Sequence, residues 1–129
     1  LQEILDTEPN TKCERALATW KEIGPLNLQQ IIEESHLDFN EQYEIKEIDR
    51  TNAKWHGWSL NGEKHGFGRS IWKDDGGIFE GILENGNWAE KGYGRYIYPA
   101  GFENKYYIGE FKKSKKHGKG ILYKTDGTV

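Results

Sequence analysis

Three glycine-rich segments follow one another in the second half of the chain and repeat the same order of residue types. Each opens with an aromatic residue and a glycine two positions later, passes through a polar stretch, and closes on Gly-x-Gly. The closing glycines Gly68, Gly94 and Gly120 are 26 residues apart in both intervals. A fixed period of this kind is the signature of a repeat array, in which each unit stacks on its neighbours to bury its apolar face.

The pattern inside each unit fits a β-hairpin. Side chains alternate between the two faces of a strand, so the opening aromatic residue and the glycine two positions later share a face. The glycines Gly57, Gly81 and Gly109 then leave gaps in an aromatic face. We expect a ring from a neighbouring hairpin to lie against the backbone at each gap.

Residue pairs typical of turns separate the predicted strands. Asn-Gly occurs at 61–62 and 85–86, and it suits the positive backbone dihedrals of a tight hairpin turn. Asp-Gly occurs at 75–76 and 126–127 and predicts chain reversals between units.

The repeated phrase resembles the MORN repeat, which reads roughly Tyr-x-Gly-x-Trp/Phe, a polar turn, His-Gly-x-Gly, and alternating aromatics before Asp-Gly. The third unit, 107–129, fits without insertion; the first, 55–78, departs at two aromatic positions, and the second, 79–106, has two extra residues in its turn. The resemblance implies a mainly β fold, a twisted single-layer sheet of antiparallel hairpins. It also leads us to expect further repeats beyond residue 129.

The first 54 residues show no part of this pattern. We divide them into a helical segment, 1–40, and a connecting strand segment, 41–54. Residues 43–48 alternate as a half-exposed strand would. Because repeat arrays need their ends covered, we expect the helices to cap the first hairpin. The alternative is a detachable amphipathic segment that docks on a partner or in the array's own groove.

Two helices are predicted in the helical segment. Thr11 is the expected N-cap of the first, with Glu14 at the third helical position, and Gly24-Pro25 is the expected end. The second is expected over 27–36, where Leu28, Ile31, Ile32 and Leu37 form one apolar stripe.

Composition favours a partly extended protein stabilised by aromatic packing. The 129 residues are 35% hydrophobic with a mean hydropathy of -0.89, which is lean for a compact core, but 13% are aromatic and bury large areas. The single cysteine, Cys13, excludes an internal disulfide framework. We therefore expect a reducing, cytoplasmic setting. The resemblance adds cytoskeletal, ciliary and peripheral membrane locations.

Charge is divided between the halves, with a net charge of -6 over 1–54 and +3 over 55–129. The basic excess is concentrated in five lysines: Lys112, Lys113, Lys115, Lys116 and Lys119. Such a cluster attracts anionic lipid headgroups at about 1 kcal/mol per residue or orients an acidic partner. The alternative is a solvated turn whose lysines keep a strand edge soluble.

Catalytic and metal-binding chemistry finds little support. His65 and His117 occupy the same position in two units, and no ligand spacing accompanies them. Nucleic acid binding is disfavoured because the aromatic residues have a structural assignment and the isoelectric point is near 5.8. We expect neither an enzyme nor a cofactor or metal.

The resemblance implies an interaction module that holds a protein partner along the groove of its sheet. Trp58 and Trp88 are the preferred anchors, since neither is needed for the repeat core, although Trp58 and Trp88 could instead contact the helical cap. The expected partner-binding residues are Trp58, Trp72, Trp88, Tyr96, Tyr98 and Phe111. The alternatives are a peripheral membrane module for anionic phospholipids and a regulatory domain of a larger enzyme. Self-association through the edges of the sheet is a further prediction.

Overall fold

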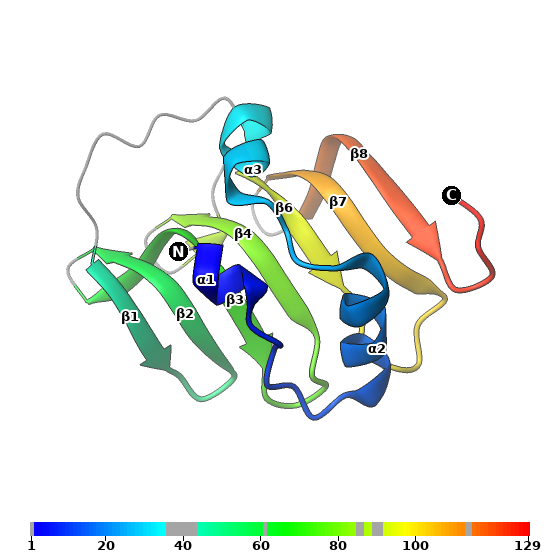
Figure 1. Ribbon diagram of the computed structural model, residues 1–129, viewed down its shortest axis with the longest axis horizontal. Helices are drawn as coiled ribbons and strands as arrows, with labels where there is room; N and C mark the ends of the chain where they lie inside the picture. Colours follow the sequence, from blue (N-terminus) through cyan, green and yellow to red (C-terminus); the bar gives the residue numbers. More distant parts are fainter. Residues whose placement is uncertain (1, 36–43, 61, 85–86, 89–91, 113–114) are drawn as a thin grey trace.

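The computed structural model describes residues 2–35, 44–60, 62–84, 87–88, 92–112 and 115–129 (Figure 1). Three short helices precede the strands: α1 (Gln2–Asp6), α2 (Glu14–Ile23) and α3 (Leu28–Ser35). The strands are β1 (Glu44–Asp49), β2 (Ala53–Leu60), β3 (Glu63–Trp72), β4 (Ile78–Glu84), β5 (Asn87–Trp88), β6 (Gly92–Ile97), β7 (Asn104–Lys112) and β8 (Lys115–Lys124).

All eight strands belong to one antiparallel sheet. The order along the sheet is β1-β2-β3-β4-β6-β7-β8, and the short β5 pairs only with β4. Neighbours in the sheet are therefore neighbours in the sequence, as expected for a chain of hairpins, except that β5 lies between β4 and β6 in the sequence. The prediction of a mainly β fold, a single-layer sheet of antiparallel hairpins with helices in the N-terminal part of the chain, is confirmed.

A row of glycines crosses the sheet at right angles to the strands. Each glycine is the register partner of the next, and the row runs through Gly57, Gly68, Gly81, Gly94, Gly109 and Gly120. A Cβ atom added at Gly68 would lie 2.3 Å from the Trp55 ring. One at Gly120 would lie 2.1 Å from the Tyr107 hydroxyl. Side-chain atoms are excluded along this row because rings lie directly on its backbone.

The rings that cover the glycine row come from the units that contain the glycines. Trp55 lies on Gly57 and Gly68, Phe79 on Gly81 and Gly94, and Tyr107 on Gly109 and Gly120. The expectation of a ring from a neighbouring hairpin was therefore wrong. The opening aromatic side chain leans along its own strand and reaches the glycine two residues further on.

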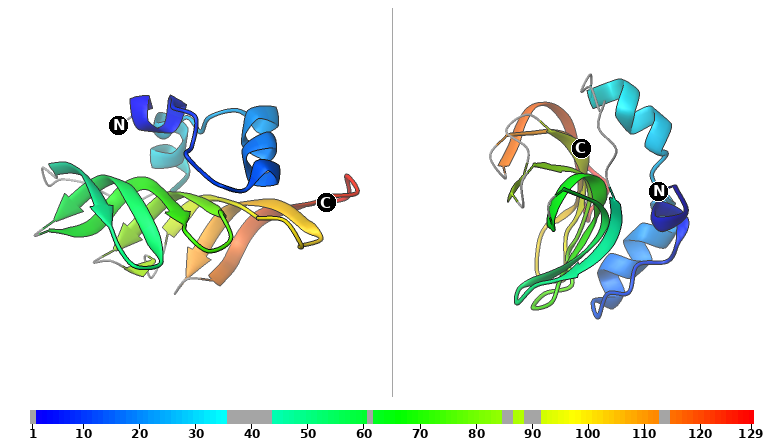
Figure 2. Two further views of the ribbon diagram at one scale, coloured as in Figure 1. Left: turned by 90° about the horizontal axis from the view of Figure 1, so that it is seen from below. Right: turned by 90° about the vertical axis from the view of Figure 1, so that its left-hand side faces the viewer.

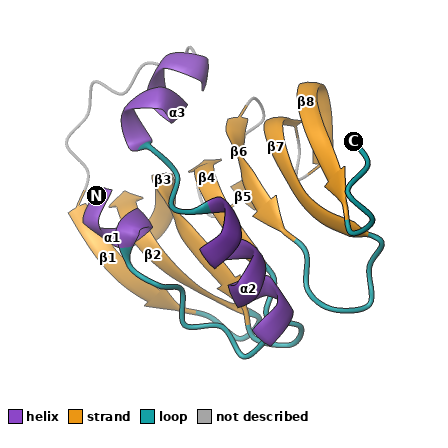
Figure 3. Cartoon of the chain, turned by 45° about the vertical axis from the view of Figure 1, so that its right-hand side comes forward, coloured by secondary structure: helices purple, strands orange, loops and turns teal. Residues whose placement is uncertain are grey.

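The sheet has two unlike faces. The helices all lie on one side of it, which we call the helix-side face (Figures 2 and 3). The strands bow so that this face is convex in the right-hand view of Figure 2. No helix formed by the described residues lies on the other, concave side, which we call the open face.

Among the described residues, two apolar clusters lie on the helix-side face and one lies on the open face. Two clusters join the helices to the helix-side face: Leu5, Leu26, Ile31, Phe67 and Ile82, and then Cys13, Ala16, Trp20, Ile78 and Ile97. On the open face the buried cluster is Ile48, Trp55, Phe79, Tyr107 and Phe111. The helices reach beyond the first hairpin, because α1 packs on β3 whereas α2 and α3 pack on β6. Strand β1 occupies the end of the sheet next to the first hairpin.

Helix α2 begins two residues later than predicted. Its N-cap is Cys13, whose Sγ accepts a hydrogen bond from the Ala16 amide at 3.5 Å. Thr11 was the expected cap, but its hydroxyl donates instead to the Gly76 carbonyl at 2.6 Å. The predicted end is confirmed, since Gly24 ends the helix with a φ of 79°, a conformation that glycine adopts without steric cost.

The rest of the N-terminal segment follows the sequence pattern less closely. Asn27 Oδ1 accepts from the Gln30 amide at 3.0 Å, so Asn27 caps α3. Helix α1 was not predicted; Gln2 fixes it by donating to the Leu26 carbonyl and accepting from the Leu28 amide. Residues 36–43, which include part of the predicted second helix and of the predicted strand, lie outside the described residues. In β1 only Ile48 is buried.

The predicted turns coincide with reversals of the chain wherever the structure describes them. Gly62, Gly76 and Gly127 have φ values of 79°, 79° and 89°, in the region that favours glycine. The remaining predicted turn residues, 61 and 85–86, lie outside the described residues.

Candidate interaction surfaces

A buried ion cluster lies beside the glycine row on the helix-side face. Glu80 is fully buried; its Oε2 accepts from Arg69 Nε at 3.0 Å and Nη2 at 2.8 Å, and its Oε1 accepts from Arg95 Nη2 at 2.8 Å. The three residues are register partners on β3, β4 and β6. Two guanidinium groups therefore share one carboxylate, and the cluster carries one excess positive charge.

Arg69 also fastens the N-terminal segment to the sheet. Its Nη2 donates to the Leu5 carbonyl at 2.9 Å and its Nη1 to the Thr7 carbonyl at 2.7 Å. These carbonyls belong to the end of α1 and the residue after it, where cations are favoured by the helix dipole. Sequence reasoning missed this cluster. The signal available was Gly-Arg at the same position of two units, Gly68-Arg69 and Gly94-Arg95.

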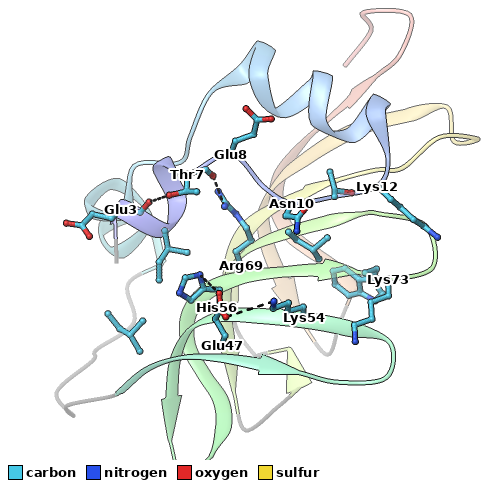
Figure 4. A pocket seen from close by; sticks show the side chains of 15 residues that line it. Glu3, Thr7, Glu8, Asn10, Lys12, Glu47, Lys54, His56, Arg69 and Lys73 are labelled. Atoms are coloured by element: carbon cyan, nitrogen blue, oxygen red, sulfur yellow. Dashed lines mark hydrogen bonds and ion pairs between the residues drawn. The ribbon is translucent and has the colours of Figure 1, made fainter.

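A cleft of about 840 Å³ opens between the N-terminal segment and strands β1 to β3 on the helix-side face (Figure 4). Its lining includes apolar residues, among them Ile4, Ile45 and Ile71. Ile45 is 51% exposed, so part of its side chain can be reached from the cleft. The charged residues that line the cleft are Glu3, Glu8, Lys12, Glu47, Lys54, Arg69 and Lys73.

The charges of the cleft are arranged around strand β1. The Glu47 carboxylate lies between Lys54 Nζ at 4.0 Å and His56 Nδ1 at 3.9 Å. Lys73 bonds to Asp49. This hydrogen bond, and then the charge of Lys73, lower the pKa of the Asp49 carboxyl. All three pairs are exposed, so each contributes little to stability.

A continuous run of aromatic rings lies at one edge of the open face. The ring of Trp72 meets that of Tyr96 edge-to-face at 5.8 Å, and Tyr96 meets Tyr98 in the same way at 4.8 Å. Tyr98 then contacts Phe102 at 5.7 Å. We call these four residues the aromatic run. Edge-to-face pairs at such distances are favourable, so the rings support one another.

The structure separates the six predicted partner-binding residues. Trp72, Tyr96 and Tyr98 are half-buried and come together in the aromatic run. Phe111 is 4% exposed in the open-face cluster, where it packs edge-to-face on Phe79 and Tyr107. Trp58 lies on the helix-side face against Phe67, in the cluster that also holds residues of α3.

Some predicted residues fall outside what the structure describes. Trp88 belongs to β5, but its side chain is not among those described. The same holds for the side chains of Lys112, Lys115 and Lys116 and for the whole of Lys113. Lys119 is exposed on β8, and its amide donates to Glu110 Oε2 at 3.0 Å.

Phe102 was missed by the sequence analysis. It is 51% exposed in the loop between β6 and β7, where no strand alternation marks it as part of a face. The available signal was its place four residues after Tyr98 in a stretch already rich in aromatic residues.

Two findings concern metals and membranes. The described residues hold no group of three or more histidine, cysteine or carboxylate side chains placed to bind a metal ion. Among the helices that the structure describes, none is both long and apolar enough to cross a bilayer.

Comparison with protein-family models identifies the MORN repeat in three segments, at residues 60–77, 90–102 and 107–129. Each segment falls inside one of the three units predicted from the glycine pattern, so the prediction of three such units is confirmed. A comparison with curated proteins found no match.

Proposed function

Since the second half of this chain is an array of three MORN repeats, we propose that it is a non-catalytic scaffold that holds a protein partner on the open face of its sheet. MORN repeats occur in proteins that act through interactions with membranes or other proteins, and the repeat itself is a non-catalytic type. The aromatic run is the single observation on which we base the proposal that the ligand is a protein and that it binds to the open face.

The aromatic run has the chemistry of a binding hot spot. Tryptophan and tyrosine are enriched among the few interface residues that contribute most of the binding energy, because large rings give contact area at low cost in side-chain entropy. In this chain, Trp72, Tyr96 and Tyr98 are half-buried, and Phe102 is more exposed than any of them. Each ring thus keeps part of its surface available to a partner.

The loop that carries Phe102 is held in place from both ends. The Tyr98 amide donates to the Lys105 carbonyl at 3.0 Å, and Pro99 is fully buried. From helix α2, Arg15 Nη2 donates to the Phe102 carbonyl at 3.0 Å. A loop fixed in its bound conformation loses little entropy on association, which raises affinity.

The proposal can be tested by quantitative affinity capture from a cell lysate. The intact chain is compared with a Tyr98→Ser/Phe102→Ser variant, and each captured protein is then purified and titrated against both. We expect the variant to bind its partner at least about tenfold more weakly, as truncation of hot-spot residues does.

Ile121→Ser serves as the control, because Ile121 is 44% exposed but lies on the outer strand β8, away from the aromatic run and from the cleft. Circular dichroism must show that all variants are folded. Equal affinity of the Tyr98→Ser/Phe102→Ser variant and the intact chain for every captured protein would refute the proposal.

A second proposal is that the lysine cluster binds anionic membranes, which is supported by the occurrence of MORN repeats in membrane-interacting proteins. Lys119 is exposed on the last strand of the sheet, at its opposite end from β1. We expect sedimentation with phosphatidylserine vesicles that weakens with salt and is lost when the five lysines are replaced by glutamate. Salt-independent sedimentation would contradict this proposal.

A further inference from the structure

We propose that the cleft between the N-terminal segment and strands β1 to β3 is a second binding site, which receives an extended acidic peptide. It lies on the helix-side face, whereas the aromatic run lies on the open face. Trp72, at the end of β3, is the one member of the aromatic run that also lines the cleft, so substitutions of Tyr98 and Phe102 test the open face separately. A chain with both would hold two ligands on opposite sides of one sheet.

The shape of the cleft suits an extended peptide. Its floor is made of the side chains that β1, β2 and β3 present to the helix-side face, and α1 with the segment after it forms one wall (Figure 4). Its volume of about 840 Å³ is in the range of sites that enclose a ligand of several residues or a drug-sized molecule. Ile45 and Ile71 both line it and give an apolar ligand side chain a place to pack.

The charge of the floor favours an acidic ligand, whereas the wall carries Glu3 and Glu8. Glu8 pairs with Lys21 at 3.7 Å, so the acidic part of the ligand is expected over the floor and not against this wall. Arg69 lines the cleft and belongs to the buried cluster in which Glu80 offsets only one of two arginines. A buried charge is poorly screened by salt. A carboxylate above Arg69 would therefore be attracted more strongly than one at an exposed lysine.

The end of the cleft near Lys12 adds further positive charge. Lys54 and Lys73 each have a carboxylate close by, Glu47 and Asp49 respectively. Lys12 lines the same region (Figure 4) and pairs with none of the carboxylates that the structure describes. Among the described residues, this end thus carries one positive charge without a counter-ion. The buried cluster beneath the floor has an excess charge of the same sign. An extended peptide with an acidic residue here and an apolar residue at Ile45 matches both features.

The experiment is selection of binders from a library of randomised decapeptides displayed on phage, with the full chain as bait. We expect enriched peptides to combine an apolar residue with an excess of aspartate and glutamate. Their affinities, measured by fluorescence anisotropy, should fall about tenfold in Lys12→Glu and severalfold in Ile45→Ser, since each change removes a contact at one end of the cleft.

The controls are Lys124→Glu and Ile121→Ser, equivalent changes of exposed residues on β8, which should leave these affinities unchanged. Tyr98→Ser/Phe102→Ser should do the same. Enrichment without an acidic excess, affinities insensitive to Lys12→Glu, or no enrichment over a bait-free selection would each overturn the inference. Peptides whose binding is lost only in Tyr98→Ser/Phe102→Ser would overturn it while supporting the proposed function of the open face.

Discussion

The two faces of the sheet are built from the same strands but are stabilised in opposite ways. On the open face, the opening aromatic of each unit lies on the glycines of that unit, so the face is filled from within the repeat. On the helix-side face, the strands present isoleucines, Phe67 and an ion cluster that helices α1 to α3 cover. The repeat pattern thus determines one face and leaves the other to a segment outside the array.

This difference shows what each face can contribute to function. The open face is formed by the repeats alone and keeps a run of half-buried rings at its edge. On the helix-side face the covering segment is shorter than the sheet, and strands β1 and β2 extend beyond α1. The cleft lies at this uncovered part, so it is a consequence of adding a short helical segment to a longer array.

The strongest test of the comparison is Glu80→Gln on the helix-side face. Removing the charge of Glu80 leaves Arg69 and Arg95 buried without a counter-ion, and breaking such a cluster costs about 3–5 kcal/mol. We expect the free energy of unfolding, measured with urea, to fall by this amount. Glu47→Gln is the control, because Glu47 makes only exposed ion pairs worth at most about 1 kcal/mol. A similar loss in the free energy of unfolding in both variants would show that the buried ion cluster stabilises the fold no more than an exposed ion pair does.

Gly68→Ala tests the open face. The new Cβ would meet the Trp55 ring at 2.3 Å, and such overpacking costs about 1–3 kcal/mol. A double-mutant cycle with Trp55→Leu checks the cause, since removing the ring should recover part of the loss. Additive effects of the two substitutions in urea unfolding would mean that the ring does not exclude the side chain.

Arg15→Ala tests whether the helix-side segment holds the binding loop of the other face. Arg15 Nη2 donates to the carbonyls of Phe102 and Asn104 at 3.0 and 3.5 Å. Loss of these bonds should reduce the protection of loop amides against hydrogen exchange by about 1 kcal/mol. Lys21→Ala, on the same helix, removes only an exposed ion pair with Glu8 and should leave the loop unchanged. Unchanged protection of the loop amides in Arg15→Ala would show that helix α2 does not hold the loop that carries Phe102.

The sequence predicted the open face better than the helix-side face for a physical reason. The glycine period and strand alternation are local patterns, and they located the hairpins and the turn glycines that the structure describes. They did not show that Trp55 would cover its own glycines, because alternation gives the face of a side chain but not the direction in which it leans.

The features missed on the helix-side face depend on contacts between distant parts of the chain. Thr11 has the right chemistry for an N-cap, but its bond to Gly76 across 65 residues leaves Cys13 as the cap. Helix α1 has five residues, too few to show a helical period. The cleft could not be predicted either, because residues 3–12 and 45–73 meet only in the folded chain.

The smallest expected effect concerns the buried tyrosines, whose ionisation changes the free energy of unfolding only at alkaline pH. Burial raises the pKa of four tyrosines, Tyr93 and Tyr106 on the helix-side face and Tyr96 and Tyr107 on the open face. The shift is largest for Tyr96, to which Asp75 also contributes. A tyrosine in the unfolded chain ionises near pH 10. Above that pH the unfolded state therefore loses protons that the folded state keeps, and stability falls as pH rises.

We expect these tyrosines to make a constant contribution to the free energy of unfolding, measured with urea, below about pH 10. Above that pH the contribution should decline steadily. Tyr96→Phe removes the group with the largest shift, so its stability should decline less steeply than that of the intact chain, whereas Tyr93→Phe should change the slope less. Absorbance of the tyrosinate ion in the folded protein provides an independent check, since Tyr96 should be the last of the four to ionise. If Tyr96→Phe and the intact chain declined in parallel, Tyr96 would be as accessible to water as an ordinary surface tyrosine, and the open face would be less tightly packed than its ring contacts indicate.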